Sequence, residues 1–132
     1  MELGEVFEKC ISDKDVLEIN PIALAFIGDG VHTLFVRDKV IKSDNLLLKN
    51  YHRQSALYCN AKKQASEMEK ILQYLNEDEL YIIKRTRNSK IHHTAKNSDE
   101  KTYKMATCFE ALIGYLYLTG KYDRLNEILK IN

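Results

Sequence analysis

Two carboxylates lie where apolar residues dominate the sequence. Asp29 falls within the stretch IALAFIGDGVHTLF and Glu110 within MATCFEALIGYLYL, the two most apolar stretches of the chain. A carboxylate among apolar side chains costs free energy unless it is paired, protonated or bound to a metal ion. Each acid alone is explained equally well by a structural role, such as pairing with a buried arginine. Carboxylates on two facing helices can converge on a divalent ion, so together they predict a magnesium-type site.

Two glycines flank the first of these acids. Gly28 and Gly30 stand on either side of Asp29, in a segment that otherwise has the apolar character of a buried helix. Glycine costs about 1 kcal/mol in a helix relative to alanine, but it allows a second helix, a metal ion or a substrate to approach closely. The glycines are consistent with close helix packing alone or with a functional site.

The sequence offers little support for other catalytic chemistry. It contains no glycine-rich phosphate loop of the Walker or dinucleotide type and no Gly-x-Ser-x-Gly nucleophile motif. His92 and His93 are adjacent, and no second ligand pair follows at zinc spacing. Cys10, Cys59 and Cys108 share no short spacing, so we interpret them as reduced thiols and not as a zinc or disulfide set.

One segment concentrates positive charge in a chain whose net charge is only +1. Residues 84–96 read KRTRNSKIHHTAK and contain five Lys or Arg, two His and no carboxylate. A solvated loop explains this segment when it is taken alone. A basic patch of this kind is also typical of phosphate contact in nucleic-acid-binding proteins.

The hydrophobic pattern predicts an all-α single domain over residues 1–132, built from five to seven helices. Asn20-Pro21 is typical of a helix start, and the apolar residues that follow predict a buried central helix over 20–43. Further helices are expected over 45–73, with a break near 51–53, over 76–87, over 98–118 and around 125–131. An exposed loop is expected over 88–97, and Gly120 is expected to end the helix over 98–118.

Length and composition exclude several classes of protein. The chain has 132 residues, of which 45% are hydrophobic and 30% charged, as in ordinary globular proteins. The longest strictly apolar stretch, residues 22–27, is far shorter than the ~20 residues that a membrane helix needs. No signal peptide is visible after Met1, so a cytoplasmic location is the default expectation.

The two acidic segments, in this order, resemble the catalytic domain of the ribonuclease III family. ALAFIGDGV is similar to the family's signature helix, and CFEALIGYLYL to its second catalytic helix. The similarity is greatest to the short bacterial branch, Mini-ribonuclease III, with which the chain shares its length, its NxxALAxxGD opening, an RNxK loop at residues 87–90 and a KNxDxxTY stretch at residues 96–103. The resemblance covers residues 20–125.

The resemblance implies a helical endonuclease domain without a double-stranded-RNA-binding domain. Asp29 and Glu110 would be the catalytic residues and would bind Mg²⁺. Where the full-length enzymes have two further acids, this chain has Ala25 and Thr107, as Mini-ribonuclease III does. The implied activity is the cleavage of double-stranded RNA by a homodimer, with precursor of large-subunit (23S) ribosomal RNA as substrate. Phosphate contacts are expected from Arg85, Arg87, Lys90 and Lys96.

Two other functions remain as alternatives. A non-catalytic double-stranded-RNA-binding dimer could share the fold, although a pure RNA binder gains nothing from two buried acids. An all-α metal-dependent nucleotide hydrolase would need a further acidic pair on a core helix, and Glu67 and Glu69 do not have that spacing.

Overall fold

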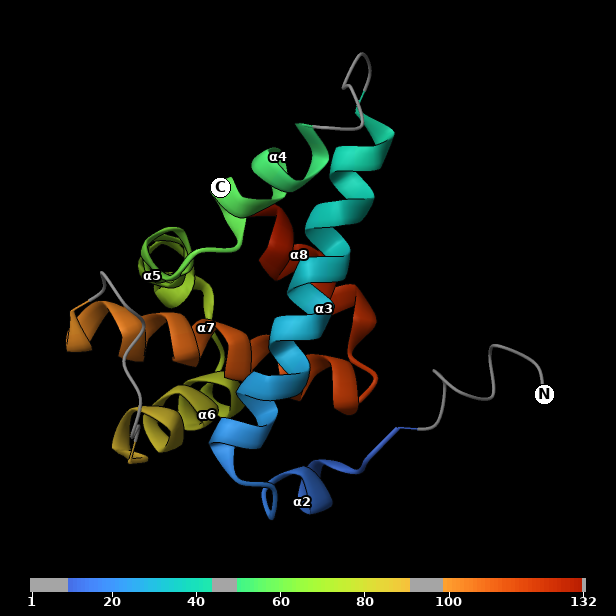
Figure 1. Ribbon diagram of the computed structural model, residues 1–132. Coiled ribbons are helices and arrows are strands. Elements are labelled where there is room, and N and C mark those ends of the chain that lie inside the picture. The colour runs from blue at the N-terminus through green and yellow to red at the C-terminus, as the bar shows by residue number, and fades with distance from the viewer. Residues whose placement is uncertain (1–9, 44–49, 91–98, 132) are drawn as a thin grey trace.

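The computed structural model describes residues 10–43, 50–90 and 99–131, and every regular element in these ranges is a helix. Figure 1 shows the helices crossing one another at steep angles. This arrangement confirms the predicted all-α fold. The elements are α2 (Asp13–Val16), α3 (Pro21–Lys42), α4 (Tyr51–Tyr58), α5 (Ala61–Ile71), a short 3₁₀ turn η2 (Leu72–Tyr74), α6 (Glu77–Asn88), α7 (Glu100–Leu118) and α8 (Tyr122–Lys130).

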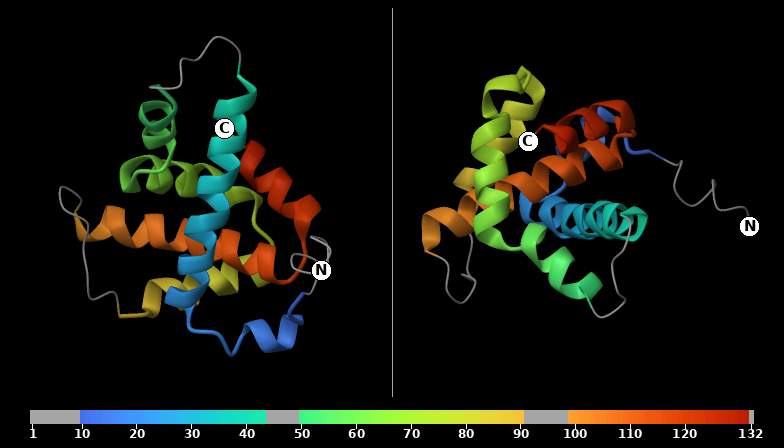
Figure 2. Two further views of the ribbon diagram at one scale, coloured as in Figure 1. Left: turned by 45° about the vertical axis from the view of Figure 1, so that its right-hand side comes forward. Right: turned by 90° about the horizontal axis from the view of Figure 1, so that it is seen from above.

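Helix α7 forms the centre of the fold and contacts α3, α5, α6 and α8. Within residues 106–116, every residue is buried except Glu110. Helix α3 lies across α7, and both views in Figure 2 show the two helices in contact. The core therefore forms around α7, and the crossing of α3 and α7 is its most extensive helix pair.

Glycines allow these two helices to meet at their backbones. A Cβ atom on Gly28 would lie 1.7 Å from the Glu110 carbonyl oxygen, and one on Gly114 would lie 2.0 Å from the Leu24 carbonyl oxygen. Neither position can hold a side chain without moving a helix. A Cβ on Gly30 would meet nothing within 4 Å, so only Gly28 has the close-packing role predicted for the pair.

Helix ends follow local capping chemistry. The Asn20 side chain accepts a hydrogen bond from the Ile22 amide at the start of α3, as predicted. Gly120, with φ of 72°, follows the end of α7 in the left-handed conformation that glycine favours. Two boundaries were predicted wrongly. The break between α4 and α5 was expected near residues 51–53 but lies at Cys59 and Asn60, because Asn60 caps α5. Helix α7 was expected to begin at residue 98 but begins at Glu100, with Asp99 as its cap.

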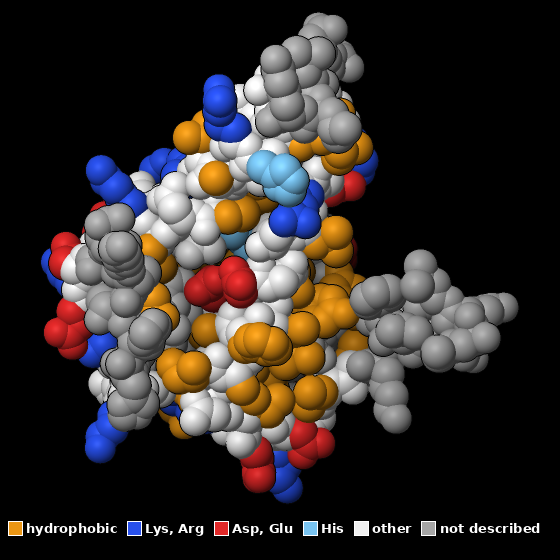
Figure 3. Space-filling view, viewed as in Figure 1, with side chains coloured by type: hydrophobic (Ala, Val, Ile, Leu, Met, Phe, Trp, Pro, Cys, Tyr) orange, Lys and Arg blue, Asp and Glu red, His pale blue; other side chains and the backbone are white. Residues whose placement is uncertain are grey.

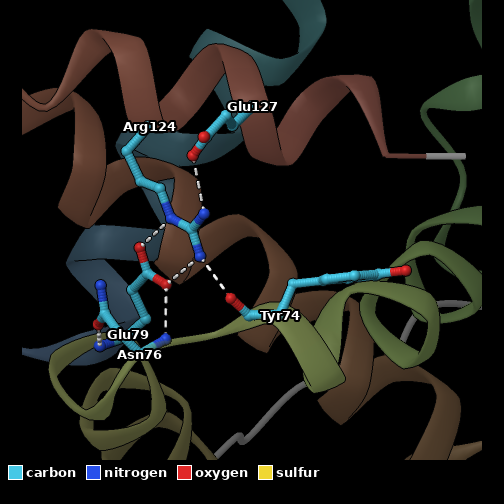
Figure 4. Close-up of polar contacts among 5 residues, drawn as sticks. All are labelled: Tyr74, Asn76, Glu79, Arg124 and Glu127. Carbon is cyan, nitrogen blue, oxygen red and sulfur yellow. Dashed lines mark hydrogen bonds and ion pairs between the residues drawn. The ribbon is translucent and has the colours of Figure 1, made fainter.

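An ion-pair network joins α6 to α8 at the edge of the core (Figure 4). Arg124 donates hydrogen bonds to both oxygens of Glu79, at 2.8 Å each, and to the Tyr74 carbonyl oxygen. Glu79 is 1% exposed and also accepts from the Asn76 amide in a capping box. Burial would raise the pKa of Glu79, but its hydrogen bonds from Arg124 and Asn76 outweigh burial and lower it.

The candidate active site

The crossing of α3 and α7 brings the two predicted carboxylates together. Asp29 follows Gly28 on α3, and the Glu110 carbonyl lies against Gly28 from α7. The side chains of Asp29 and Glu110 lie close enough for Asp29 to raise the pKa of Glu110, both as a hydrogen-bond partner and through its charge. In Figure 3, an acidic patch lies near the centre of the face over this crossing. The convergence of two facing helices that the sequence predicted is therefore present.

The predicted burial of Asp29 is wrong. Its side chain is exposed, while Glu110 is half buried. The apolar sequence around Asp29 was misleading because α3 packs against α7 on one face only. On its other face α3 exposes apolar side chains, and Phe26 is 82% exposed. The carboxylate pair therefore faces solvent along one edge.

The protonation of Glu110 reflects this placement. Burial raises the pKa of Glu110 to about 9, and the hydrogen bond to Asp29 and its negative charge act in the same direction. Glu110 therefore holds its proton at neutral pH in the metal-free protein. A divalent cation can take the place of that proton, because it neutralises both carboxylates at once.

Two residues that the sequence analysis did not single out complete the site. Gln64 of α5 is 4% exposed and lies close enough to Glu110 to act on its pKa as a hydrogen-bond donor, in the direction opposite to the larger effect of burial. Gln64 Nε2 lies 3.2 Å from Nδ1 of His32, which is 5% exposed. Gln64 occupies a position of α5 whose following turns are apolar and buried, at Met68 and Ile71. A polar residue on the apolar face of this helix was the signal by which the sequence could have revealed Gln64.

The donor set suits a hard cation that keeps part of its water shell. In the described ranges, no cluster of three or more His, Cys, Asp or Glu side chains could enclose a metal ion. Magnesium is commonly held by one or two carboxylates, with water and substrate phosphates as its other ligands. Asp29 and Glu110 match this pattern, because their oxygens adjoin open solvent on one side.

Ala25 and Thr107, which stand where the full-length enzymes have further acids, are buried in the core. Ala25 precedes Asp29 by one helical turn and is 6% exposed. Thr107 precedes Glu110 by one turn, is 7% exposed, and donates its hydroxyl hydrogen to the Tyr103 carbonyl oxygen. Within the described residues, the site is therefore built on a single carboxylate pair.

The four basic residues expected to contact RNA differ in their surroundings. Arg87 and Lys90 are exposed at and after the end of α6. Arg85 is half buried, donates to the Ile19 carbonyl oxygen at 3.2 Å and lies over the Tyr81 ring. Lys96 lies outside the described residues, as do His92 and His93. Arg85 thus already links α6 to the chain segment before α3.

A cavity of about 240 Å³ lies nearby but does not contain the carboxylates. It reaches His32 on one side and is lined by Lys39, Lys63 and Phe109 among others. The carboxylate pair instead faces solvent on the surface shown in Figure 3. A polymer can approach such an open site without entering the protein.

Comparison with known proteins decides the family. A model of the Ribonuclease III domain matches residues 22–121, which include both carboxylates. The chain belongs to the ribonuclease III family. The resemblance drawn from the two acidic helices is thereby confirmed, and ribonuclease III proteins are endoribonucleases.

In the described parts of this ribonuclease III chain, none of the helices has the length and apolar character that a membrane crossing requires.

Individual relatives of this ribonuclease III chain agree in length as well as sequence. It is 40% identical to Mini-ribonuclease 3 of Clostridium tetani over 98% of its own length and 83% of the relative. It is 40% identical to Mini-ribonuclease 3 of Enterococcus faecalis over 88% of its length and 89% of the relative. A crystal structure of a Fusobacterium nucleatum protein aligns with a TM-score of 0.79 at 29% identity, covering 85% of this chain and 91% of that one.

Proposed function

We propose that this protein is a magnesium-dependent endoribonuclease that cleaves double-stranded RNA as a single catalytic domain. The observation that carries the proposal is the close pair of carboxyl groups of Asp29 and Glu110 on an open face of a ribonuclease III domain. In line with the resemblance to the Mini-ribonuclease III branch, we propose as substrate the double-stranded part of the 23S ribosomal RNA precursor, in the cytoplasm.

Asp29 and Glu110 would hold Mg²⁺ through their carboxylate oxygens. When bound, the ion would polarise the scissile phosphate, activate a water molecule and stabilise the leaving 3′ oxygen. Glu110 is half buried, and the exposed Asp29 beside it leaves room for a phosphate. Reaction by water requires no protein nucleophile, which agrees with the lack of a nucleophile motif.

Recognition of the duplex would depend on its shape. The minor groove of A-form RNA is wide and shallow, and proteins contact its phosphates and 2′-hydroxyls. We assign the phosphate contacts to the exposed Arg87 and Lys90, with Lys96 further along the same basic segment. Arg85 shares the segment, but contact with a phosphate would compete with its bond to the Ile19 carbonyl.

We further propose that the protein acts as a homodimer through the exposed face of α3. Phe26 is 82% exposed and Leu34, two helical turns later, is 67% exposed, while Ile22 is 37% exposed. In Figure 3, hydrophobic side chains gather below and to the right of the acidic patch. An apolar surface shared by identical chains favours a two-fold interface, which would place two sites on opposite RNA strands.

Incubation with duplex RNA, with and without Mg²⁺, tests the proposed activity. The parent protein should cut a 23S precursor transcript only with the metal, and Asp29→Asn should lower the rate by about 10²-fold or more. The variant should retain the parent's helical circular dichroism. Duplex binding by the parent without cleavage at any Mg²⁺ concentration would instead favour the non-catalytic RNA-binding dimer.

A further inference from the structure

Gln64 is a polar side chain on the buried face of α5. It is 4% exposed and lies one turn before Met68, which is fully buried. A buried amide costs free energy unless its donors and acceptor are paired, so the partners of Gln64 are informative. Nδ1 of His32 on α3 lies 3.2 Å from Nε2, and the Glu110 side chain on α7 is near enough for Gln64 to act on its pKa as a hydrogen-bond donor.

Chemistry fixes the direction of the hydrogen bond to His32 and the role that Gln64 takes toward Glu110. Burial lowers the pKa of His32, so the ring is neutral at neutral pH, and Nδ1 accepts when the proton is on Nε2. An ionised Glu110 can only accept. The amide nitrogen of Gln64, with its two hydrogens, is therefore the group that satisfies both neighbours.

His32 is itself held in place. It is 5% exposed, and its ring packs edge-on against Phe109 with the ring centroids 5.1 Å apart. It lies on α3 three residues after Asp29, while Phe109 directly precedes Glu110 on α7. The orientation of the Gln64 amide is thus set by residues of the same two helices that carry the carboxylates.

We propose that Gln64 is a positioning residue that orients Glu110 as a metal ligand, and that His32 orients Gln64 in turn. The donated hydrogen favours the ionised carboxylate in one orientation, which the binding of a cation requires. Groups that hydrogen-bond to metal ligands typically contribute 10- to 100-fold to metal affinity. The inference rests on the metal site of the proposed function.

Direct metal binding tests the role without RNA or turnover. Mn²⁺ is titrated into metal-free protein and the free ion is followed by electron paramagnetic resonance. Gln64→Leu removes the donor at similar volume and should weaken Mn²⁺ binding about tenfold or more. The matched control is Met68→Leu, a buried and volume-conserving change one turn further along α5, which should leave the affinity within about twofold. Gln64→Met carries the same test where Gln64→Leu does not fold.

A double-mutant cycle separates positioning from general destabilisation. His32→Phe keeps the ring against Phe109 and removes the acceptor, and the cavity of about 240 Å³ beside His32 can take the larger ring. His32→Phe should weaken Mn²⁺ binding in the parent and have no further effect in Gln64→Leu. Unchanged affinity in a folded Gln64 variant, or additive effects, would overturn the inference alone. Absence of Mn²⁺ binding by the parent would overturn the proposed metal site as well.

Discussion

Replacement of Glu110 by glutamine should stabilise the metal-free protein while it removes activity. In the folded chain the pKa of Glu110 is raised to about 9, against an ordinary value of 4.5. Between these two values the folded state retains a proton that the unfolded chain releases, so the free energy of unfolding falls as the pH rises. Glutamine is neutral at every pH and resembles the protonated acid in shape, so it avoids this cost.

The size of the effect follows from the shift. Each pH unit above the ordinary pKa costs about 1.4 kcal/mol while the folded state keeps its proton. At pH 7, 2.5 units above the ordinary pKa, the cost is at most about 3.5 kcal/mol, and partial access of water to the half-buried Glu110 reduces it to about 2–3 kcal/mol. The stability gained by Glu110→Gln should therefore be near zero at pH 4.5 and increase steadily to about this value at pH 7.

Urea denaturation in EDTA at pH values from 5 to 8 measures this difference. Glu69→Gln, at an exposed carboxylate on α5, is the control and should follow the parent. Added Mg²⁺ should stabilise the parent and leave Glu110→Gln unchanged, because only the parent keeps both ligands. A difference between Glu110→Gln and the parent that does not vary with pH would refute the assigned proton and its physical cause.

Three further predictions test the packing, the ion-pair network and the RNA contacts. Gly28→Ala should destabilise the fold by about 1–3 kcal/mol in thermal unfolding and lower activity, because its Cβ would lie 1.7 Å from a backbone oxygen. Gly30→Ala, whose Cβ would meet nothing within 4 Å, should be neutral or stabilising by up to about 1 kcal/mol in the same measurement. Glu79→Gln should lower the free energy of unfolding by about 3 kcal/mol at pH 7, because it removes the carboxylate that pairs with Arg124. The loss should become smaller as the pH falls below 4.5, because the parent's Glu79 is then protonated and loses the same negative charge. Joint replacement of Arg87 and Lys90 by alanine should weaken binding to any duplex and reduce the salt slope by about one per contact, and an unchanged slope would place the RNA elsewhere.

Local signals allowed most of the helix ends to be predicted. The cap at Asn20, the acids that follow Asn76 and the glycine at position 120 each act through neighbouring backbone groups, so sequence alone reveals them. The break at Cys59 and Asn60 was missed because residues before and after it continue the same helical periodicity. Only the side chain of Asn60, bonded to Lys63 N, distinguishes this position.

The two carboxylates were predictable, but their surroundings were not. Their convergence follows from two apolar helices that each carry one acid. The exposure of Asp29 depends on which face of α3 the rest of the chain covers, and Phe26 and Leu34 show that one apolar face is left open. The roles of Gln64 and His32 depend on contacts between residues far apart in sequence, so neither residue stood out by spacing or motif.

The close crossing of α3 and α7 explains why this site needs support from its neighbours. Gly28 removes the side chain that would separate the helices, and the acids of both helices then share one small space. With Ala25 and Thr107 at the positions of the further acids, repulsion is limited to one pair, and so is the number of protein ligands. A metal held by so few groups depends strongly on their orientation. The buried amide of Gln64 supplies that orientation from a third helix, α5, without adding another negative charge.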